Sequence, residues 1–317
     1  MLEAGEWKDY ELLDAGFGEK LERWGAYILR RPDPQAVWPP DQKIREWERA
    51  DAVYHRAESG GGRWAPNRAL PEQWQVGYKH LNFSVQLMQF KHTGLFPEQA
   101  VNWDWAAERI SGANAAAGVF ADTDASVAAG ANTAAGVFAG ASGSARVRLL
   151  NLFAYTGAAT VAAASAGAVV CHVDAARGMV AKAKDNAARS RVPFERTRYI
   201  VDDVLKFVRR EIRRGNRYDA VIMDPPAYGR GPEGELWKAE EQLYALVDLC
   251  TEVLAERPLF FLINSYTTGL SAAAIGNILR VAVERRFGGQ TESDELGLPI
   301  ARRGIVLPCG CCGRWVR

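Results

Sequence analysis

The pattern of apolar and polar positions changes along the chain, and from residue 146 onward it alternates between two periods. Short apolar runs predict strands, and the Ala-rich or amphipathic stretches between them predict helices. The expected strands are residues 147–153, 168–173, 199–201, 218–223 and 259–263, and the expected helices are residues 158–166, 175–189, 204–214 and 243–254. Such repeated units predict an α/β fold with a doubly wound (Rossmann-like) parallel sheet covered by helices.

Residues 1–110 carry a different pattern, with short alternating runs such as residues 27–29 and 83–87 between Gly and Pro. This pattern predicts a smaller, mainly β domain with short helices. Eight of the ten tryptophans precede residue 106, whereas all five cysteines follow residue 170, which supports a separate unit. We expect an N-terminal substrate-recognition domain over residues 1–110 and a second domain over residues 146–317.

The segment between them, residues 111–145, is dominated by Ala and Gly. Residues 113–121 (ANAAAGVFA) recur almost unchanged as residues 131–139 (ANTAAGVFA). Two copies are too few for a solenoid, and the segment offers little large apolar surface to bury. We interpret it as a repeat-bearing linker, with a hinged lid or an oligomerisation element as the alternative.

Polar residues follow the first three strands of the second domain, where ligands bind in doubly wound sheets. The first strand leads into Tyr155-Thr156-Gly157, which lacks the G-x-G-x-x-G of dinucleotide binders and so favours a smaller, nucleoside-like ligand. Asp174 follows the second strand and fits either ribose hydroxyls or a helix N-cap. Asp202 and Asp203 follow the third strand; one can accept from an adenine amino group while the other caps a helix, and we favour Asp203 for the ligand.

The most specific motif follows the fourth strand and reads Asp224-Pro225-Pro226-Ala227-Tyr228. Two adjacent prolines make a rigid turn, so that the Asp carboxylate and the Pro carbonyls converge on one spot beside an aromatic ring. Such a site can hold a planar nucleobase by stacking and accept hydrogen bonds from its N–H groups. The alternative is a Pro-rich turn in which Asp serves only as a cap.

Together these residues resemble the class I S-adenosylmethionine (SAM)-dependent methyltransferases. The likeness rests on residues 151–157 (NLFAYTG), 172–174 (HVD), 201–204 (VDDV) and 224–228 (DPPAY), and is greatest to the bacterial 23S ribosomal RNA methyltransferase group. The resemblance implies SAM as cofactor and a seven-stranded sheet with an antiparallel last strand, residues 295–298 and 304–307 being the final strands. It also implies cofactor contacts from Asn151, Phe153, Tyr155, Thr156, Gly157, Asp174, Asp202 and Asp203, and catalytic roles for Asp224, Pro225, Pro226 and Tyr228.

Two further segments bear on this resemblance. Residues 90–99 resemble a small module that precedes the catalytic domain in that group, which would place Gln99 next to the cofactor. Relatives that methylate cytosine at carbon 5 carry a Cys nucleophile after the fifth strand, because carbon 6 must be attacked covalently. Residues 262–266 (LINSY) have no Cys, and Asn264 resembles the branch that methylates guanine on a ring nitrogen. Methylation on nitrogen is therefore expected.

Charge gives modest support to an RNA substrate. The whole chain has a net charge of +1, yet residues 189–217 hold ten Arg and Lys against four Asp and Glu. Such a patch can follow phosphates, although a solvated helix face explains it equally well. The expected partner is RNA, from the resemblance 23S ribosomal RNA. A methyltransferase for a small-molecule or protein amine, and a non-catalytic RNA-binding assembly factor of the same fold, remain alternatives.

Location and metal content are also constrained. Residues 1–14 are interrupted by charges and resemble neither a secretory signal nor a transit peptide, and the Ala-rich residues 158–173 lack the apolar density of a membrane span. The five cysteines include Cys309, Cys311 and Cys312, whose spacing is not that of a zinc site. We therefore expect a cytoplasmic protein without a metal site or a membrane partner.

Overall fold

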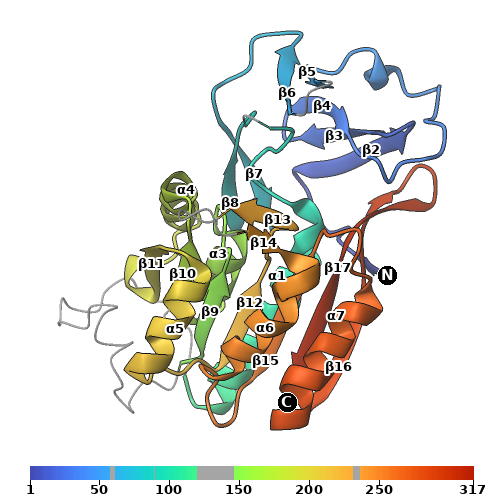
Figure 1. Ribbon diagram of the computed structural model, residues 1–317. Helices are drawn as coiled ribbons and strands as arrows, with labels where there is room; N and C mark the ends of the chain where they lie inside the picture. Colours follow the sequence, from blue (N-terminus) through green and yellow to red (C-terminus); the bar gives the residue numbers. More distant parts are fainter. Residues whose placement is uncertain (58–60, 89, 120–145, 231–235) are drawn as a thin grey trace. The chain divides into compact units, whose positions relative to one another are not determined.

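The computed structural model describes residues 1–57, 61–88, 90–119, 146–230 and 236–317 (Figure 1). The chain forms two compact units: unit 1 is Met1–Val101 with Leu296–Cys309, and unit 2 is Asn102–Glu295 with Gly310–Arg317. The boundary expected at residue 110 lies inside a helix, α1 (Ala100–Ala116). Most of the expected linker, including the second copy of the repeat, lies outside the described residues.

Unit 1 is mainly β, which confirms the sequence prediction. Its strands are β2 (Tyr10–Gly16), β3 (Glu19–Trp24), β4 (Tyr27–Pro32), β5 (Ala52–Arg56) and β6 (Gly62–Pro66), paired in that order, and the hairpin β7 (Trp74–Tyr78) and β8 (Leu81–Val85). Two 3₁₀ helices, η1 (Arg45–Trp47) and η2 (Pro97–Gln99), provide the short helices. In β7, alternate residues Trp74, Val76 and Tyr78 are buried, as expected for a strand with one face on the core.

Unit 2 is built on a twisted sheet with helices on both sides. The strands occur in the order β16 (Gln290–Ile300), β17 (Ile305–Val316), β15 (Phe260–Ser265), β12 (Ala220–Met223), β9 (Arg148–Leu152), β10 (Val169–Asp174) and β11 (Thr197–Val201). The five strands from β15 to β11 run parallel, and β17 runs antiparallel to β15. The predicted doubly wound sheet is therefore confirmed.

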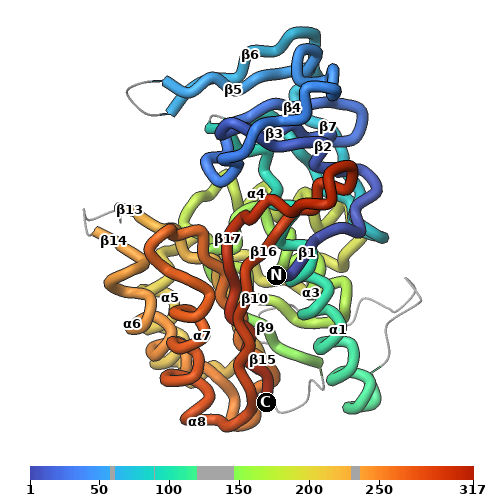
Figure 2. Tube along the Cα trace, turned by 90° about the vertical axis from the view of Figure 1, so that its right-hand side faces the viewer, coloured from blue at the N-terminus to red at the C-terminus, as the bar shows by residue number. Residues whose placement is uncertain are grey.

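The helices of unit 2 divide between the faces of this sheet. On one side lie α1 and α3 (Ala158–Ser165), with α4 (Arg177–Arg189) packed on α3; on the other lie α5 (Val204–Arg214), α6 (Ala239–Thr251) and α7 (Ala272–Leu279), as Figure 2 shows. A π-helical turn (Arg280–Glu284) and α8 (Arg285–Phe287) continue α7. None of the helices in the described ranges is both long enough and apolar enough to cross a membrane.

Three parts of the fold were not expected. Helix α1 was not predicted, because its last residues belong to the Ala-rich segment that was assigned to the linker. The segments 295–298 and 304–307 belong to much longer strands, β16 and β17. A short strand, β1 (Leu2–Glu3), pairs in parallel with Leu296 and Gly297 of β16, so within the described residues the sheet has eight strands, not the seven implied by the resemblance.

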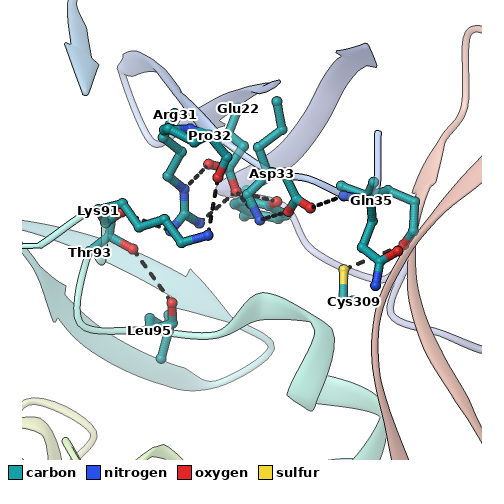
Figure 3. Close-up of polar contacts among 12 residues, drawn as sticks. Glu22, Arg31, Pro32, Asp33, Gln35, Lys91, Thr93, Leu95 and Cys309 are labelled. Carbon is teal, nitrogen blue, oxygen red and sulfur yellow. Dashed lines mark hydrogen bonds and ion pairs between the residues drawn. The ribbon is translucent and has the colours of Figure 1, made fainter. Parts of the chain in front are cut away.

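A buried ionic cluster holds β3 and β4 of unit 1 together (Figure 3). Glu22 is fully buried, and its carboxylate accepts hydrogen bonds from the Arg31 guanidinium at both oxygens and from the Tyr10 hydroxyl at 2.8 Å. Lys20 lies 3.1 Å from Asp33 in the same cluster. Burial alone would raise the pKa of Glu22, but Arg31 and Lys20 and the two donors outweigh it and lower the pKa to about 2.

Glu22→Gln should destabilise unit 1 by about 3 kcal/mol or more, because it leaves the Arg31 charge buried without its carboxylate. Urea unfolding followed by tryptophan fluorescence measures this. Glu11→Gln is the matched control, since Glu11 pairs with Arg23 at a position that is only partly buried, and its loss should cost under about 1 kcal/mol. Because the folded pKa of Glu22 is lowered, its stabilisation is complete above the unfolded value of about 4.3 and is lost as the pH falls toward 2. Equal effects of the two substitutions would contradict this role.

Candidate functional site

The carboxyl ends of four neighbouring strands are joined by backbone hydrogen bonds. These are Ala154 N–H to Val173 O at 3.1 Å, Asp202 N–H to Asp174 O at 3.1 Å and Asp224 N–H to Leu152 O at 3.4 Å. Since β10, β9 and β12 are parallel neighbours, their ends meet at one edge of the sheet. The structure thus brings the residues predicted to follow the strands to the edge where doubly wound folds bind ligands.

The turn between β9 and α3 has an unusual backbone. Phe153, Tyr155 and Gly157 all have positive φ, at 54°, 49° and 82°. Positive φ is uncommon for residues other than Gly, and such conformations gather at ligand sites. A side chain at Gly157 would place its Cβ 2.6 Å from the Cβ of Ala183 in α4, so only Gly fits there. The turn is therefore held in a fixed shape close to α4.

The Asp174 carboxylate fixes this turn from the end of β10. Its Oδ2 accepts the N–H of Tyr155 and its Oδ1 accepts the N–H of Ala176, both at 2.8 Å. Burial raises the pKa of Asp174, although these two backbone donors oppose the rise. The residue therefore joins the loop before α4 to the turn after β9, and each oxygen keeps a lone pair for another donor.

A chain of buried polar side chains supports the turn from below. Asn151 donates to Thr160 Oγ1 at 2.9 Å, and Thr160 Oγ1 lies 2.9 Å from His172 Nδ1. Burial lowers the pKa of His172 to about 3, so its ring is neutral. Asn186 of α4 donates to the carbonyl of the buried Thr156 at 2.9 Å. Asn151 is 3% exposed and supports the turn from inside this interface, and its expected contact with the cofactor stays a prediction.

Asp203, which we favoured for the ligand, caps a helix in the structure, and the adenine contact expected of this pair stays a prediction. Asp203 is the N-cap of α5, and its Oδ1 accepts the N–H of Lys206 at 2.8 Å. Asp202 accepts the N–H of Asp203 at 2.9 Å and forms an ion pair with Arg210. Asp203 therefore caps α5, and the backbone N–H of Asp202 donates to the Asp174 carbonyl at the strand edge. The sequence alone does not indicate which of two adjacent Asp residues caps the helix.

The Asp224-Pro-Pro turn leads into a hairpin formed by β13 (Tyr228–Arg230) and β14 (Leu236–Lys238). Tyr228 pairs with Lys238 and Gly229 pairs with Trp237. Because paired residues share a face and neighbours alternate, Tyr228 and Trp237 lie on opposite faces. Tyr228, the expected stacking residue, is 55% exposed.

Trp237 is the residue that sequence reasoning missed. Its indole N–H donates to the Pro226 carbonyl at 2.6 Å, and its ring centroid lies 6.0 Å from that of Phe153. It therefore connects the turn after β12 to the turn after β9. The Pro226 carbonyl, expected to face a ligand, already has a donor. The sequence signal was only one aromatic residue, between Leu236 and Lys238, ahead of α6.

The cysteines and Asn264 lie in packed surroundings. Asn264 is buried and accepts a hydrogen bond from Asn102 at 2.8 Å, while Asn102 accepts from Arg314 Nε at 2.9 Å. Burial raises the pKa of Cys171 to about 12 and that of Cys311 to about 11, and it also raises the pKa of the other three thiols. Among the described residues, no three His, Cys, Asp or Glu side chains gather as a metal site would require.

Gln99 lies in η2 of unit 1, where it is buried. Its expected place beside the cofactor stays a prediction.

Comparison with known proteins agrees with this geometry. The family model described as S-adenosylmethionine-dependent methyltransferase matches residues 140–240. The ribosomal RNA large subunit methyltransferase K/L of Chromohalobacter salexigens is 34% identical over 139 residues, covering 43% of this chain and 18% of that one. Methyltransferase K of Neisseria meningitidis is 29% identical over 120 residues, covering 37% of this chain and 34% of that one. The chain thus spans only about a third or less of these relatives.

A solved structure matches almost the whole chain. The SAM-dependent methyltransferase from Agrobacterium tumefaciens is 33% identical with a TM-score of 0.84, covering 99% of this chain and 92% of that one. Another solved structure, of a protein complexed with S-adenosylhomocysteine, is 18% identical with a TM-score of 0.67, covers 98% of this chain and 76% of its own, and shares the fold. On the near-complete match to the Agrobacterium protein, the chain belongs to the SAM-dependent methyltransferases.

Proposed function

We propose that this protein transfers the methyl group of SAM to a nitrogen atom of a base in RNA, specifically ribosomal RNA, in the cytoplasm. The observation that carries the proposal is the Asp224-Pro-Pro turn, whose backbone is hydrogen-bonded to Leu152 at the start of the cofactor turn. A rigid acceptor turn therefore stands beside the turn that a SAM-dependent family uses. The likeness to large-subunit ribosomal RNA methyltransferases, over the part of the chain that matches, supports RNA as acceptor.

The residues at the strand edge fit SAM. The fixed positive-φ turn lets the backbone of residues 153–157 approach the ligand, and Gly157 leaves no side chain in the way. We assign the remaining lone pairs of Asp174 to the ribose hydroxyls. We assign the adenine amino group to Asp202 because Asp203 caps α5.

The acceptor turn positions the base. When bound, SAM supplies an electrophilic methyl group, and transfer to a nitrogen lone pair needs in-line placement of that nitrogen. We assign the Asp224 carboxylate and the Pro225 carbonyl to accept hydrogen bonds from the base N–H groups. Trp237 holds the Pro226 carbonyl and so sets the direction of the turn.

The thiols support nitrogen rather than cytosine carbon 5 as the target. Methylation at carbon 5 requires a thiolate that attacks carbon 6. Burial raises the pKa of every cysteine in the chain, so each is held as the thiol, and Cys171 and Cys312 are fully buried. Direct attack by a nitrogen lone pair needs no such group.

Gly157→Ala should weaken SAM binding at least about tenfold, because Ala must adopt φ near 82° and its Cβ meets Ala183. Isothermal titration with SAM measures this. Gly178→Ala is the matched control: Gly178 lies in α4 with open space around its Cβ, and Ala there should leave affinity unchanged. Equal affinity for both variants would remove the turn from the cofactor site.

Asp224→Ala should lower kcat/KM at least about a hundredfold while SAM affinity stays within a factor of two, because it removes an acceptor that aligns the base. The assay measures methyl transfer from radiolabelled SAM into RNA of a strain that lacks the gene, with mass spectrometry of the nucleosides. Asp185→Ala, at an exposed position of α4, is the control. Label on a base nitrogen supports the proposal; label on cytosine carbon 5, or only in protein or small molecules, contradicts it.

Trp237→Phe should lower kcat/KM about tenfold, since Phe keeps an aromatic ring but cannot donate to Pro226. SAM affinity should change less than twofold. Tyr228→Phe provides the comparison, because Tyr228 lies on the other face of the hairpin. Because Tyr228→Phe keeps the ring and removes only a hydroxyl, an equal or larger loss in that variant would contradict the role of the Trp237 hydrogen bond.

A further inference from the structure

Positive charge in this chain is concentrated around one strand. Residues 189–217 carry a net charge of +6 in a chain whose total is +1, so the rest of the chain is net negative by five. These residues surround β11, the last strand of the sheet, with the end of α4 before it and α5 after it (Figure 1). We call this region the β11-edge surface and define it by Lys184, Arg191, Phe194, Arg209 and Arg213.

Most acidic groups of the region are engaged in structure. Asp202 forms an ion pair with Arg210, and Asp203 caps α5. Glu211 is fully buried and accepts hydrogen bonds from the Tyr218 hydroxyl at 2.7 Å and from Asn216 at 2.8 Å. Arg191, Arg209 and Arg213 are exposed to solvent. Asp185 and Glu195 are exposed as well, so the surface presents an excess of cations over carboxylates.

An exposed aromatic side chain, Phe194, and a cation, Lys184, both contact Tyr199 of β11. Phe194 is 67% exposed, and its ring is stacked on Tyr199 of β11 with centroids 6.0 Å apart and planes 29° apart. The Lys184 ammonium lies 5.6 Å from the centroid of Tyr199. An exposed ring that is stacked on a second ring, with a cation nearby, can serve as a platform on which an unpaired base stacks.

This surface lies away from the proposed reaction site. Phe194 precedes the amino end of β11, whereas Asp202 follows its carboxyl end, and five residues of strand separate them by about 13 Å or more. Arg213 is near the end of α5, about 15 Å along the helix from Asp203. A ligand bound here cannot be the acceptor nucleotide itself.

We propose that the β11-edge surface binds the phosphate backbone of an RNA segment outside the acceptor nucleotide, with one unpaired base stacked on Phe194. This inference rests on the proposed function, because it takes the acceptor to be part of a long RNA. An acidic protein segment would match the charge but would leave the Phe194–Tyr199 platform without a partner. Affinity thus comes from this surface, whereas the choice of base comes from the Asp224 turn.

The test compares two triple variants with the same change in charge. One is Arg191→Gln/Arg209→Gln/Arg213→Gln, and the control is Arg257→Gln/Arg280→Gln/Arg285→Gln, whose exposed side chains lie in the region that follows α6. Fluorescence anisotropy measures binding of a labelled transcript from 23S ribosomal RNA, in the absence of SAM and over a range of salt concentrations. A labelled trinucleotide is the second probe, and polyglutamate is tested as a competitor of the transcript.

The surface variant should bind the transcript at least about tenfold more weakly than the control, with the slope of log affinity against log salt flatter by about two. Phe194→Ala should weaken transcript binding roughly fivefold without changing that slope. Trinucleotide binding should be the same in all variants. Equal transcript affinity in the two triple variants overturns the inference, as does competition by polyglutamate that equals competition by RNA.

Methyl transfer separates failure of this inference from failure of the proposed function. Transfer into RNA by the wild-type protein, together with equal transcript binding by both triple variants, leaves the function standing and overturns the surface. If the wild-type protein neither binds the transcript nor transfers methyl groups into RNA, both the surface and the proposed function are overturned. If transfer is retained, the surface variant should raise KM for the transcript and leave kcat within twofold.

Discussion

The ligand edge of unit 2 depends on one partly buried carboxylate. Asp174 accepts the backbone N–H groups of Tyr155 and Ala176, and so it ties the turn after β9 to the loop before α4. A carboxylate removed from water needs donors, and a turn with three positive-φ residues needs external support. The turn supplies the Tyr155 N–H as a donor to Asp174, and Asp174 in return supports the turn. Gly157 against Ala183, and Asn186 on the Thr156 carbonyl, then fix the distance between the turn and α4.

The sequence predicted the repeating part of the fold well, because a parallel sheet imposes its own pattern. Helix α5, with Asp203 before it and Gly215 after it, was predicted with the bounds that the structure shows. Helix α1 was missed because its Ala-rich end shares its composition with the segment that follows, yet Asn114 within it accepts the N–H of Val147 and so supports the start of β9. Side-chain periodicity carries no record of such a contact between distant segments.

The candidate site was predicted by position and less well by role. Parallel strand ends must meet at one edge, so Asp174, Asp202 and Asp224 could be placed together from the order of elements alone. Which oxygen is already engaged depends on three-dimensional contacts. The sequence does not distinguish the two adjacent Asp residues, whereas the structure shows that it is Asp203 that accepts the N–H of Lys206. Likewise the hairpin turns Tyr228 and Trp237 to opposite faces, and the sequence does not indicate that Trp237 donates to the Pro226 carbonyl.

These contacts also explain how one fold can serve different acceptors. The cofactor turn is supported by fully buried groups, Thr160 and His172 among them, whose replacement would leave polar atoms unpaired. The turn after β12 is instead held by backbone hydrogen bonds from Asp224 to Leu152 and from Ala239 to Ala227, and by Trp237 on a short hairpin at the surface. Substitution there changes the direction of a carbonyl without disturbing the core. Under the proposed function, packing constrains cofactor recognition, whereas the choice of base rests on the Asp224 turn with its hairpin and RNA affinity on the charge around β11, so that these can vary independently.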